Sequence, residues 1–316
     1  MSVGHIFLIL IPIFFVIILG FLAGHFKKFN ETTSKGLNTL VTKFALPAHL
    51  FVGITTTPRS TLIQEWPFLL ALFIGIIIFY IAVLLVSRLL FKHSLTEASM
   101  FSVNSAQPTF AFMGIPVLGA LFGASAVSIP IALTGIIVNA ILDPLATIIG
   151  TVGSRTSAKE HEDLWKVTSS SILHGLKEPL ACVPLIGVIL VLFGFKSPQL
   201  VTSSLNQIGD ITSGAALFAV GVTIGLKRIS FSLTAFTIAA LKTIVQPLLM
   251  MLIAYLCGLS AADTVKAVLL VSFPGSAVAA MIAVRFDSLE AETASAFILS
   301  AVISLATLPL LISLLM

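Results

Sequence analysis

Charged residues are scarce in this chain: Asp, Glu, Lys and Arg make up 9% of its 316 residues, whereas 58% are hydrophobic. The mean hydropathy of +1.13 is far above that of a soluble globular protein. Since a helix needs ~20 apolar residues to cross a bilayer, the length allows about ten spans and no sizeable soluble domain. The composition therefore indicates an all-α polytopic membrane protein, with the lipid bilayer as its surroundings.

Motifs for cofactors and metals are also missing. The two cysteines, Cys182 and Cys257, lie in apolar segments, and neither a metal site nor a disulfide framework follows from them. No nucleotide-binding motif occurs, so we expect no cofactor and no direct use of ATP. The net charge is +4, but the basic residues form no patch, so we expect no nucleic-acid partner.

Hydropathy predicts ten spans, which we place at about 5–25, 36–56, 67–91, 95–122, 126–151, 178–195, 204–226, 232–258, 262–285 and 290–315. With the N-terminus outside, 12 Lys and Arg lie on the cytoplasmic side and two, Arg59 and Lys196, on the outer side. This bias predicts a multi-pass protein of the plasma membrane, the bacterial inner membrane, with both termini extracytoplasmic.

A cytoplasmic linker, 152–177, divides the chain into residues 1–151 and 178–316, each with five predicted spans. Because five is odd, the second half must enter the membrane in the opposite sense, which is the geometry of an inverted repeat. The end of the linker, from Leu164 to Leu176, either forms an interfacial helix anchored by Trp165 or is a solvated connection.

The most informative stretch is Ser102-Val-Asn-Ser-Ala-Gln-Pro-Thr-Phe-Ala-Phe-Met-Gly-Ile-Pro116, which interrupts a long apolar segment. Pro108 has no N–H to donate and its ring clashes with the carbonyl four residues back, so we expect a helix break. Gln107, which precedes it, is biased away from the α region. Broken backbone at membrane depth is tolerated only where it is buried in protein or lines a wet cavity. This stretch therefore predicts one half of a substrate site.

The fourth predicted span of the second half carries a matching interruption, Pro274 followed by Gly275 and Ser276. A single proline of this kind is equally compatible with a structural kink. Interrupted helices at corresponding positions of two halves, however, indicate a transporter site near the membrane midplane.

The runs Gln107-Pro-Thr-Phe-Ala-Phe-Met-Gly-Ile-Pro-Val-Leu118 and Phe273-Pro-Gly-Ser-Ala-Val-Ala-Ala-Met-Ile-Ala-Val-Arg-Phe-Asp287 resemble the auxin efflux carrier family, and the resemblance covers essentially the whole chain. This family includes the plant PIN-FORMED exporters and bacterial malonate or malate carriers. The resemblance implies ten helices in two inverted five-helix repeats, as in bile-acid sodium symporters. It implies a scaffold of spans 1, 2, 6 and 7, which usually forms a homodimer, and a moving transport domain of spans 3–5 and 8–10. Spans 4 and 9 would be broken and cross at their prolines.

The sequence differs from the plant pattern at both prolines. Plant members have Asn after the first proline, where this chain has Thr109, and a polar amide after the second, where it has Gly275. These differences argue against auxin itself as the substrate.

The two breaks have the chemistry of an anion site. The first N–H groups of a half-helix lack intrahelical partners and carry roughly half a positive charge, so two facing N-termini can bind an anion. Gly275 lets the backbone approach a ligand closely. The predicted substrate-binding residues at the breaks are Asn104, Gln107, Pro108, Thr109, Phe110, Pro274, Gly275 and Ser276.

Five further residues are candidates because polar groups inside membranes are costly. His49 either binds substrate or carries a proton, or is a satisfied core residue. Asp210 either couples transport to a cation or proton or is hydrated near the outer surface, and Ser213 is a candidate substrate contact. Lys242 either snorkels or pairs with a carboxylate. Arg285 either pairs with a departing substrate or anchors the inner end of its span.

These features predict a secondary active transporter for a small carboxylate, most simply a dicarboxylate such as malonate or malate, moving by an elevator-type mechanism. H⁺ or Na⁺ is the possible coupling ion. The alternatives are an anion channel or facilitative pore, a receptor, or an exporter of auxin-like aromatic carboxylates. An intramembrane enzyme is disfavoured because no Ser–His pair, His-Glu-x-x-His motif or aspartate cluster lies in the spans.

Overall fold

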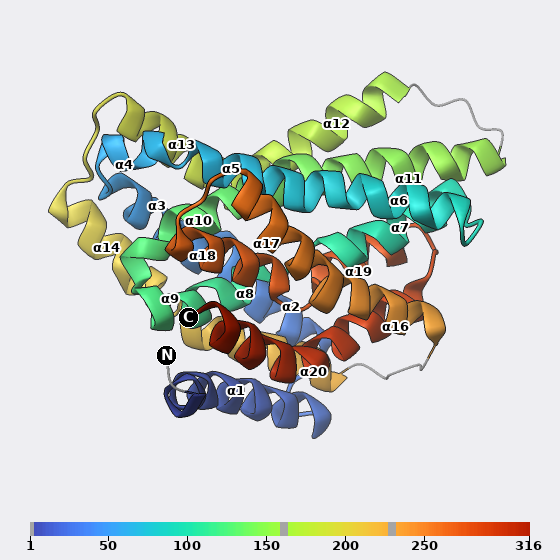
Figure 1. The fold of residues 1–316 in the computed structure, drawn as a ribbon, viewed down its shortest axis with the longest axis horizontal. Coiled ribbons are helices and arrows are strands. Elements are labelled where there is room, and N and C mark those ends of the chain that lie inside the picture. The colour runs from blue at the N-terminus through green and yellow to red at the C-terminus, as the bar shows by residue number, and fades with distance from the viewer. Residues whose placement is uncertain (1–2, 159–163, 227–231) are drawn as a thin grey trace.

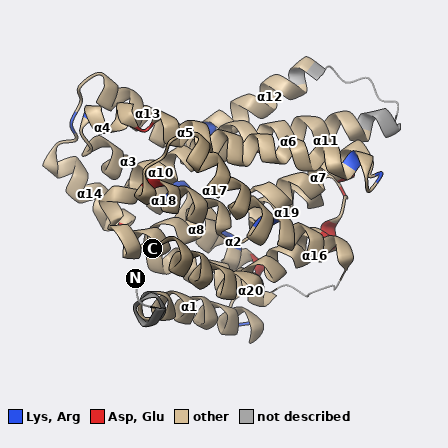
Figure 2. Ribbon diagram, in the orientation of Figure 1, with Lys and Arg blue, Asp and Glu red and all other residues tan. Residues whose placement is uncertain are grey.

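The computed structural model describes residues 3–158, 164–226 and 232–316. All regular secondary structure named within these ranges is helical (Figure 1). Lys227 and Arg228, two of the 12 basic residues predicted on the cytoplasmic side, lie outside the described residues. The middle of the linker, 159–163, lies outside them as well. Most of the ribbon in Figure 2 carries no charge, and Lys, Arg, Asp and Glu occur as isolated spots rather than as one patch.

The chain before the linker forms α1 (Val3–His25), α2 (Glu31–Thr39), α3 (Leu46–Thr55), α4 (Arg59–Gln64), α5 (Trp66–Phe73), α6 (Phe79–Leu89), α7 (Leu95–Ala106), α8 (Phe110–Met113), α9 (Gly119–Phe122), α10 (Ala124–Ile137) and α11 (Asp143–Ala158). The remainder forms α12 (Leu164–Lys177), α13 (Pro179–Leu192), α14 (Gln199–Gly209), α15 (Thr212–Leu226), α16 (Leu233–Ala240), α17 (Gln246–Leu256), α18 (Ala261–Ser272), α19 (Ala277–Arg285) and α20 (Glu290–Leu315). Helix α12 confirms that the end of the linker is helical.

Several of these helices are joined end to end by short π-helical segments, at Leu40–Ala45, Ile74–Ile78, Gly114–Leu118, Val138–Leu142 and Leu241–Val245. All but Ile74–Ile78 contain a proline or have one two residues beyond their end, at Pro47, Pro116, Pro144 and Pro247. A proline withholds one backbone donor and crowds the preceding turn, so the helix widens locally instead of ending.

Six helical stretches are long and apolar enough to cross a membrane, and a seventh is counted if α12 and α13, bent by 68°, form one span. The six are Glu31–Thr55, Trp66–Leu89, Ala124–Ser154, Gln199–Leu226, Leu233–Leu256 and Glu290–Leu315. The apolar stretches Leu10–His25 and Phe110–Phe122 are shorter. The protein is therefore a multi-pass helical membrane protein, whereas ten spans in two inverted repeats stay a prediction.

Helix α1 packs closely along α15 because small residues face each other at the contact. A Cβ added at Gly20 would collide with the Phe218 carbonyl oxygen, and one added at Gly221 would collide with the Ile17 carbonyl oxygen. Close backbone approach at glycine is a common mode of helix packing in membranes, where burial of apolar surface gives little driving force.

The other helices make two sets of contacts that meet in the middle of the molecule. Helix α3 packs on α10, α13 and α14, and α15 packs on α1 and α2. Helix α7 packs on α6, α11 and α19, and α16 to α20 pack largely on one another. The two sets contact each other where α1 meets α20 and α10 meets α18, and α8 lies between them, in contact with α15 and the segment Leu40–Ala45. The division into scaffold and transport domain stays a prediction.

Candidate functional site at the meeting of two helix breaks

The first break separates α7 from α8 by three residues in non-helical conformations. Helix α7 ends at Ala106, and Gln107 takes an extended conformation with φ −79° and ψ 115°. Thr109 follows with φ −80° and ψ 45°, and its side chain makes no capping hydrogen bond to α8. The predicted break is confirmed, since the proline forces its predecessor out of the helix as expected.

The second break separates α18 from α19. Helix α18 ends at Ser272, and Phe273 is extended with φ −58° and ψ 149°. Ser276 begins α19 by capping it, with its Oγ accepting a hydrogen bond from the Val278 N–H at 3.1 Å. Ser300 of α20 supports the same break, because its Oγ accepts a hydrogen bond from the Gly275 N–H at 2.9 Å.

The two breaks contact each other directly. Pro108 and Gly275 form an isolated antiparallel β-bridge, and the Thr109 N–H donates a hydrogen bond to the Pro274 carbonyl oxygen at 2.9 Å. A Cβ on Gly275 would lie 3.4 Å from the Ser300 Oγ and 3.6 Å from the Asn104 carbonyl oxygen, so the glycine is closely surrounded. Pro108 and Gly275 are 167 positions apart in the sequence, and their segments therefore form one junction of four helix ends, here called the crossover.

The polar side chains of the crossover are buried. Asn104, Gln107 and Thr109 are each no more than 4% exposed. Asn104 holds the two broken spans together, because its Nδ2 donates to the Met100 carbonyl oxygen at 2.9 Å and to the Ala279 carbonyl oxygen at 3.2 Å. The Gln107 Oε1 is different: it is buried and has no hydrogen-bond partner among the described residues. Leaving a buried amide oxygen unpaired costs ~1–3 kcal/mol, which a bound hydrogen-bond donor would recover.

Lys242 lies at the same junction and is fully buried. Its Nζ contacts the Ala106 and Val271 carbonyl oxygens and the Gln246 Oε1. The expectation that Lys242 either snorkels to the surface or pairs with a carboxylate is wrong in this structure. Its described hydrogen-bond partners are neutral oxygen atoms, two of them at helix ends.

The other candidates lie on α3, at the boundary of α14 and α15, and at the end of α19. Gly209, the last residue of α14, packs directly on the backbone of His49 in α3. Asp210 follows Gly209 in the chain. His49 and Ser213 are partly buried, whereas Asp210 and Arg285 are exposed in the single chain. Arg285 ends α19, where a basic residue complements the C-terminal dipole.

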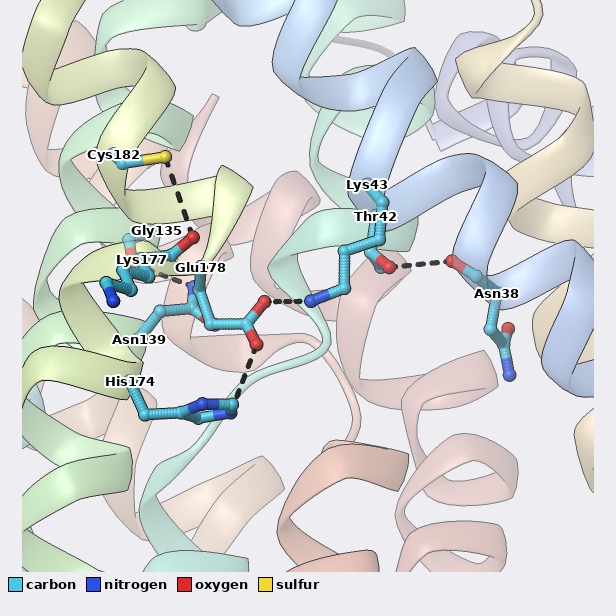
Figure 3. A network of polar contacts seen from close by, with 9 residues as sticks. All are labelled: Asn38, Thr42, Lys43, Gly135, Asn139, His174, Lys177, Glu178 and Cys182. Carbon is cyan, nitrogen blue, oxygen red and sulfur yellow. Dashed lines mark hydrogen bonds and ion pairs between the residues drawn. The ribbon is translucent and has the colours of Figure 1, made fainter. Parts of the chain in front are cut away.

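A polar network that the sequence did not reveal links three helical segments near one end of α13 (Figure 3). Glu178, the residue before α13, forms an ion pair with Lys43, and its other oxygen lies 3.5 Å from the His174 Nε2. This ion pair therefore connects two predicted scaffold spans, 36–56 and 178–195. Lys43 and Glu178 are 135 residues apart, so their spacing in the sequence does not predict this pair.

Two of the cavities formed by the described residues have linings that lack crossover residues. One, of about 670 Å³, is mainly apolar and lies between α3, α13 and α14. The other, of about 500 Å³, is lined by Arg59, Lys196 and hydroxyl side chains such as Thr56 and Ser197. No group of His, Cys, Asp and Glu within the described ranges is arranged to hold a metal ion.

A family model described as "Membrane transport protein" matches residues 5–312. An Escherichia coli K12 protein named "Uncharacterized transporter YfdV" is 30% identical over 279 residues, which cover 88% of this chain and 87% of that protein. A Rhizobium meliloti protein named "Putative malonate transporter" is 24% identical over 95% of this chain and 92% of its own length. The mouse "Lysosomal cholesterol signaling protein" is 26% identical over 79% of this chain, but over only 30% of its own length.

Proposed function

We propose that this protein is a secondary active transporter of a small organic anion, most simply a dicarboxylate such as malonate or malate. The chain belongs to the membrane transport protein family of auxin efflux carriers. Family membership makes it a transporter rather than an enzyme. The name of the Rhizobium meliloti relative supports malonate as the first substrate to try.

The observation that carries this proposal is the direct contact of the two helix breaks. Helices α8 and α19 both begin at the crossover, so the partial positive charges of two N-termini converge there. Backbone N–H groups at such N-termini bind carboxylates without a full positive charge. The Thr109 hydroxyl and the Gln107 amide lie beside the first N-terminus, where they would orient the anion.

Burial of the crossover supports an alternating-access mechanism. Gln107 and Thr109 are nearly inaccessible, so a substrate can reach them only after a change of conformation. The crossover must therefore open to each side in turn. In the elevator-type mechanism that we propose, the predicted transport domain slides along the predicted scaffold at the contact of α8 with α15. A homodimer formed through the scaffold helices would hold that contact steady in the plasma membrane.

Flux into proteoliposomes tests the proposed function. We expect uptake of labelled malonate or malate that saturates with concentration and is accelerated by unlabelled substrate on the opposite side. Conductance that does not saturate would instead identify an anion channel or facilitative pore. Preference for indole-3-acetate over every dicarboxylate would identify an exporter of auxin-like acids, and absence of any carboxylate flux would reject the anion carrier.

A further inference from the structure

Lys242 neither reaches the surface nor pairs with a carboxylate of the described residues, contrary to the expectation for a lysine in a membrane span. Its side chain is fully buried, in the π-helical segment Leu241–Val245 between α16 and α17. A buried ammonium is costly unless every one of its N–H donors finds an acceptor. The surroundings of its Nζ atom therefore determine what this lysine does.

Three oxygen atoms surround the Lys242 Nζ. The Gln246 Oε1 lies at 2.6 Å, the Val271 carbonyl oxygen at 2.7 Å and the Ala106 carbonyl oxygen at 3.4 Å. The orientation of the Gln246 amide is fixed by its other end, because its Nε2 donates to the carbonyl oxygens of Gly75 and Ala106, each at 3.0 Å. An ammonium has three donors and no acceptor, so the three oxygens match its protonated form.

Two of these oxygens belong to the C-terminal ends of the broken spans. Ala106 is the last residue of α7, and Val271 lies one residue before the end of α18. The last carbonyl groups of a helix lack intrahelical partners, and each C-terminus carries roughly half a negative charge. One ammonium therefore offsets the partial charges of both ends.

The same set of oxygens is typical of a site for a monovalent metal cation. Carbonyl groups at the C-terminal ends of half-helices are the groups that coordinate Na⁺ where transporters have discontinuous helices. In this chain the Lys242 ammonium already occupies that position and uses those oxygens. The N-terminal ends of α8 and α19 remain for the anion.

We propose that the Lys242 ammonium is a built-in cation of the crossover: it takes the place that a bound Na⁺ would fill, and it makes transport independent of Na⁺. The statement about transport rests on the proposed function, whereas the statement about the cation site does not. Lys242 is thus a positioning residue that holds the C-terminal ends of α7 and α18 together while the opposite ends bind substrate.

Chemical rescue of a cavity variant tests the cation site without any anion. The full chain with Lys242→Ala lacks the Nζ and three methylene groups, so n-propylammonium matches the deleted atoms. Thermal unfolding of the purified protein is followed at equal ionic strength in choline, Na⁺ and n-propylammonium. We expect Lys242→Ala to unfold several degrees below the wild type in choline, and Na⁺ or n-propylammonium to raise its midpoint saturably. The wild type should unfold at the same temperature in all three.

Matched variants separate this role from packing alone. Lys242→Met fills most of the same space without charge, so cations should not raise its unfolding midpoint. Lys266→Ala removes a lysine that is paired with Asp263 at the start of α18, and it should behave as the wild type. A folded Lys242→Ala that no cation stabilises would overturn the proposal.

The wild type provides a test that does not depend on the variant folding. Anion flux at fixed membrane potential should be equal when choline replaces Na⁺ on both sides. A requirement for Na⁺ in flux, or stabilisation of the wild type by Na⁺ over choline, would overturn the proposal. Cation rescue of Lys242→Ala without any carboxylate flux would instead reject the proposed function and leave the cation site standing.

Discussion

The two helix breaks at the crossover are built differently. At the second break two backbone N–H groups are already paired by side chains, since the Ser276 Oγ accepts from Val278 and the Ser300 Oγ accepts from Gly275. The N-terminus of α8 has no side-chain cap, so its first backbone N–H groups are the ones available to a carboxylate. Polar groups without protein partners are the ones available to a ligand. The first break is therefore the better candidate for direct contact with substrate, and the second for holding the junction in shape.

The largest expected effect comes from removing the first break. Pro108→Ala restores a backbone N–H and removes the steric block to a continuous helix, so the backbone between α7 and α8 can move away from Pro274. We expect anion flux to fall at least tenfold while the protein still inserts, measured as initial uptake per inserted protein. Thr109→Ala should also weaken flux strongly, since it removes the hydroxyl beside the uncapped N-terminus. Normal flux in both variants would contradict the crossover as the site.

Ser276→Ala sharpens the comparison, because it removes a cap rather than a ligand contact. Loss of a Ser cap costs ~1 kcal/mol of stability in typical cases. We expect a lower unfolding midpoint and a smaller loss of flux than for Thr109→Ala, seen mainly in the maximal rate. A greater loss of apparent substrate affinity in Ser276→Ala than in Thr109→Ala would reverse the assignment of the two breaks.

His49 lies in α3, in contact with Gly209 of α14. If it binds substrate or carries a proton, His49→Ala should shift the apparent affinity or the pH dependence of flux by several-fold between about pH 5 and 8, where imidazoles ordinarily titrate. His49→Gln provides a neutral control that keeps a polar side chain. Unchanged kinetics across that range in both variants would leave His49 with a packing role only.

The smallest effect is expected at the ion pair of Lys43 and Glu178, which lies outside the crossover (Figure 3). Both side chains are partly exposed, and such pairs are generally worth ~0–1 kcal/mol. Lys43→Met and Glu178→Gln should each lower the unfolding midpoint slightly and leave substrate affinity unchanged. A double-mutant cycle on thermal stability measures the coupling, and a large change of affinity in either variant would show that the substrate path reaches this end of α13.

The sequence predicted the parts of this structure that follow from local chemistry. Pro108 and Pro274 mark the two places where the helices break, as their missing backbone donors predict. Proline alone does not decide a break, because Pro130 and Pro309 lie inside continuous helices. Hydropathy placed most helices within a few residues, although the second predicted span begins earlier, at Glu31, because Asn30 caps it. The partners of the breaks required the tertiary structure. Ser300 lies 25 positions from Gly275, and Gln246 and Glu178 lie 171 and 135 positions from Gly75 and Lys43, so no spacing pattern identified these contacts.

Lys242 shows where such reasoning fails. A lysine in an apolar span suggested either snorkelling or a carboxylate partner, because those are the usual ways to satisfy a charge in a membrane. In the structure, carbonyl groups of two helix ends and one amide satisfy it instead. That solution exists only because two helices break at the same place, which is a property of the fold and not of the local sequence.

The central claim is that the crossover binds the anion. It is tested most directly by measuring how malonate and malate change the thermal stability of the wild type, Thr109→Ala and Ser276→Ala side by side. A ligand present at 100 times its dissociation constant stabilises the folded protein by ~2.7 kcal/mol. We predict a clear rise of the unfolding midpoint in the wild type and in Ser276→Ala, and little or none in Thr109→Ala. An equal rise in all three proteins would place the anion elsewhere and contradict the assignment of the crossover as the binding site.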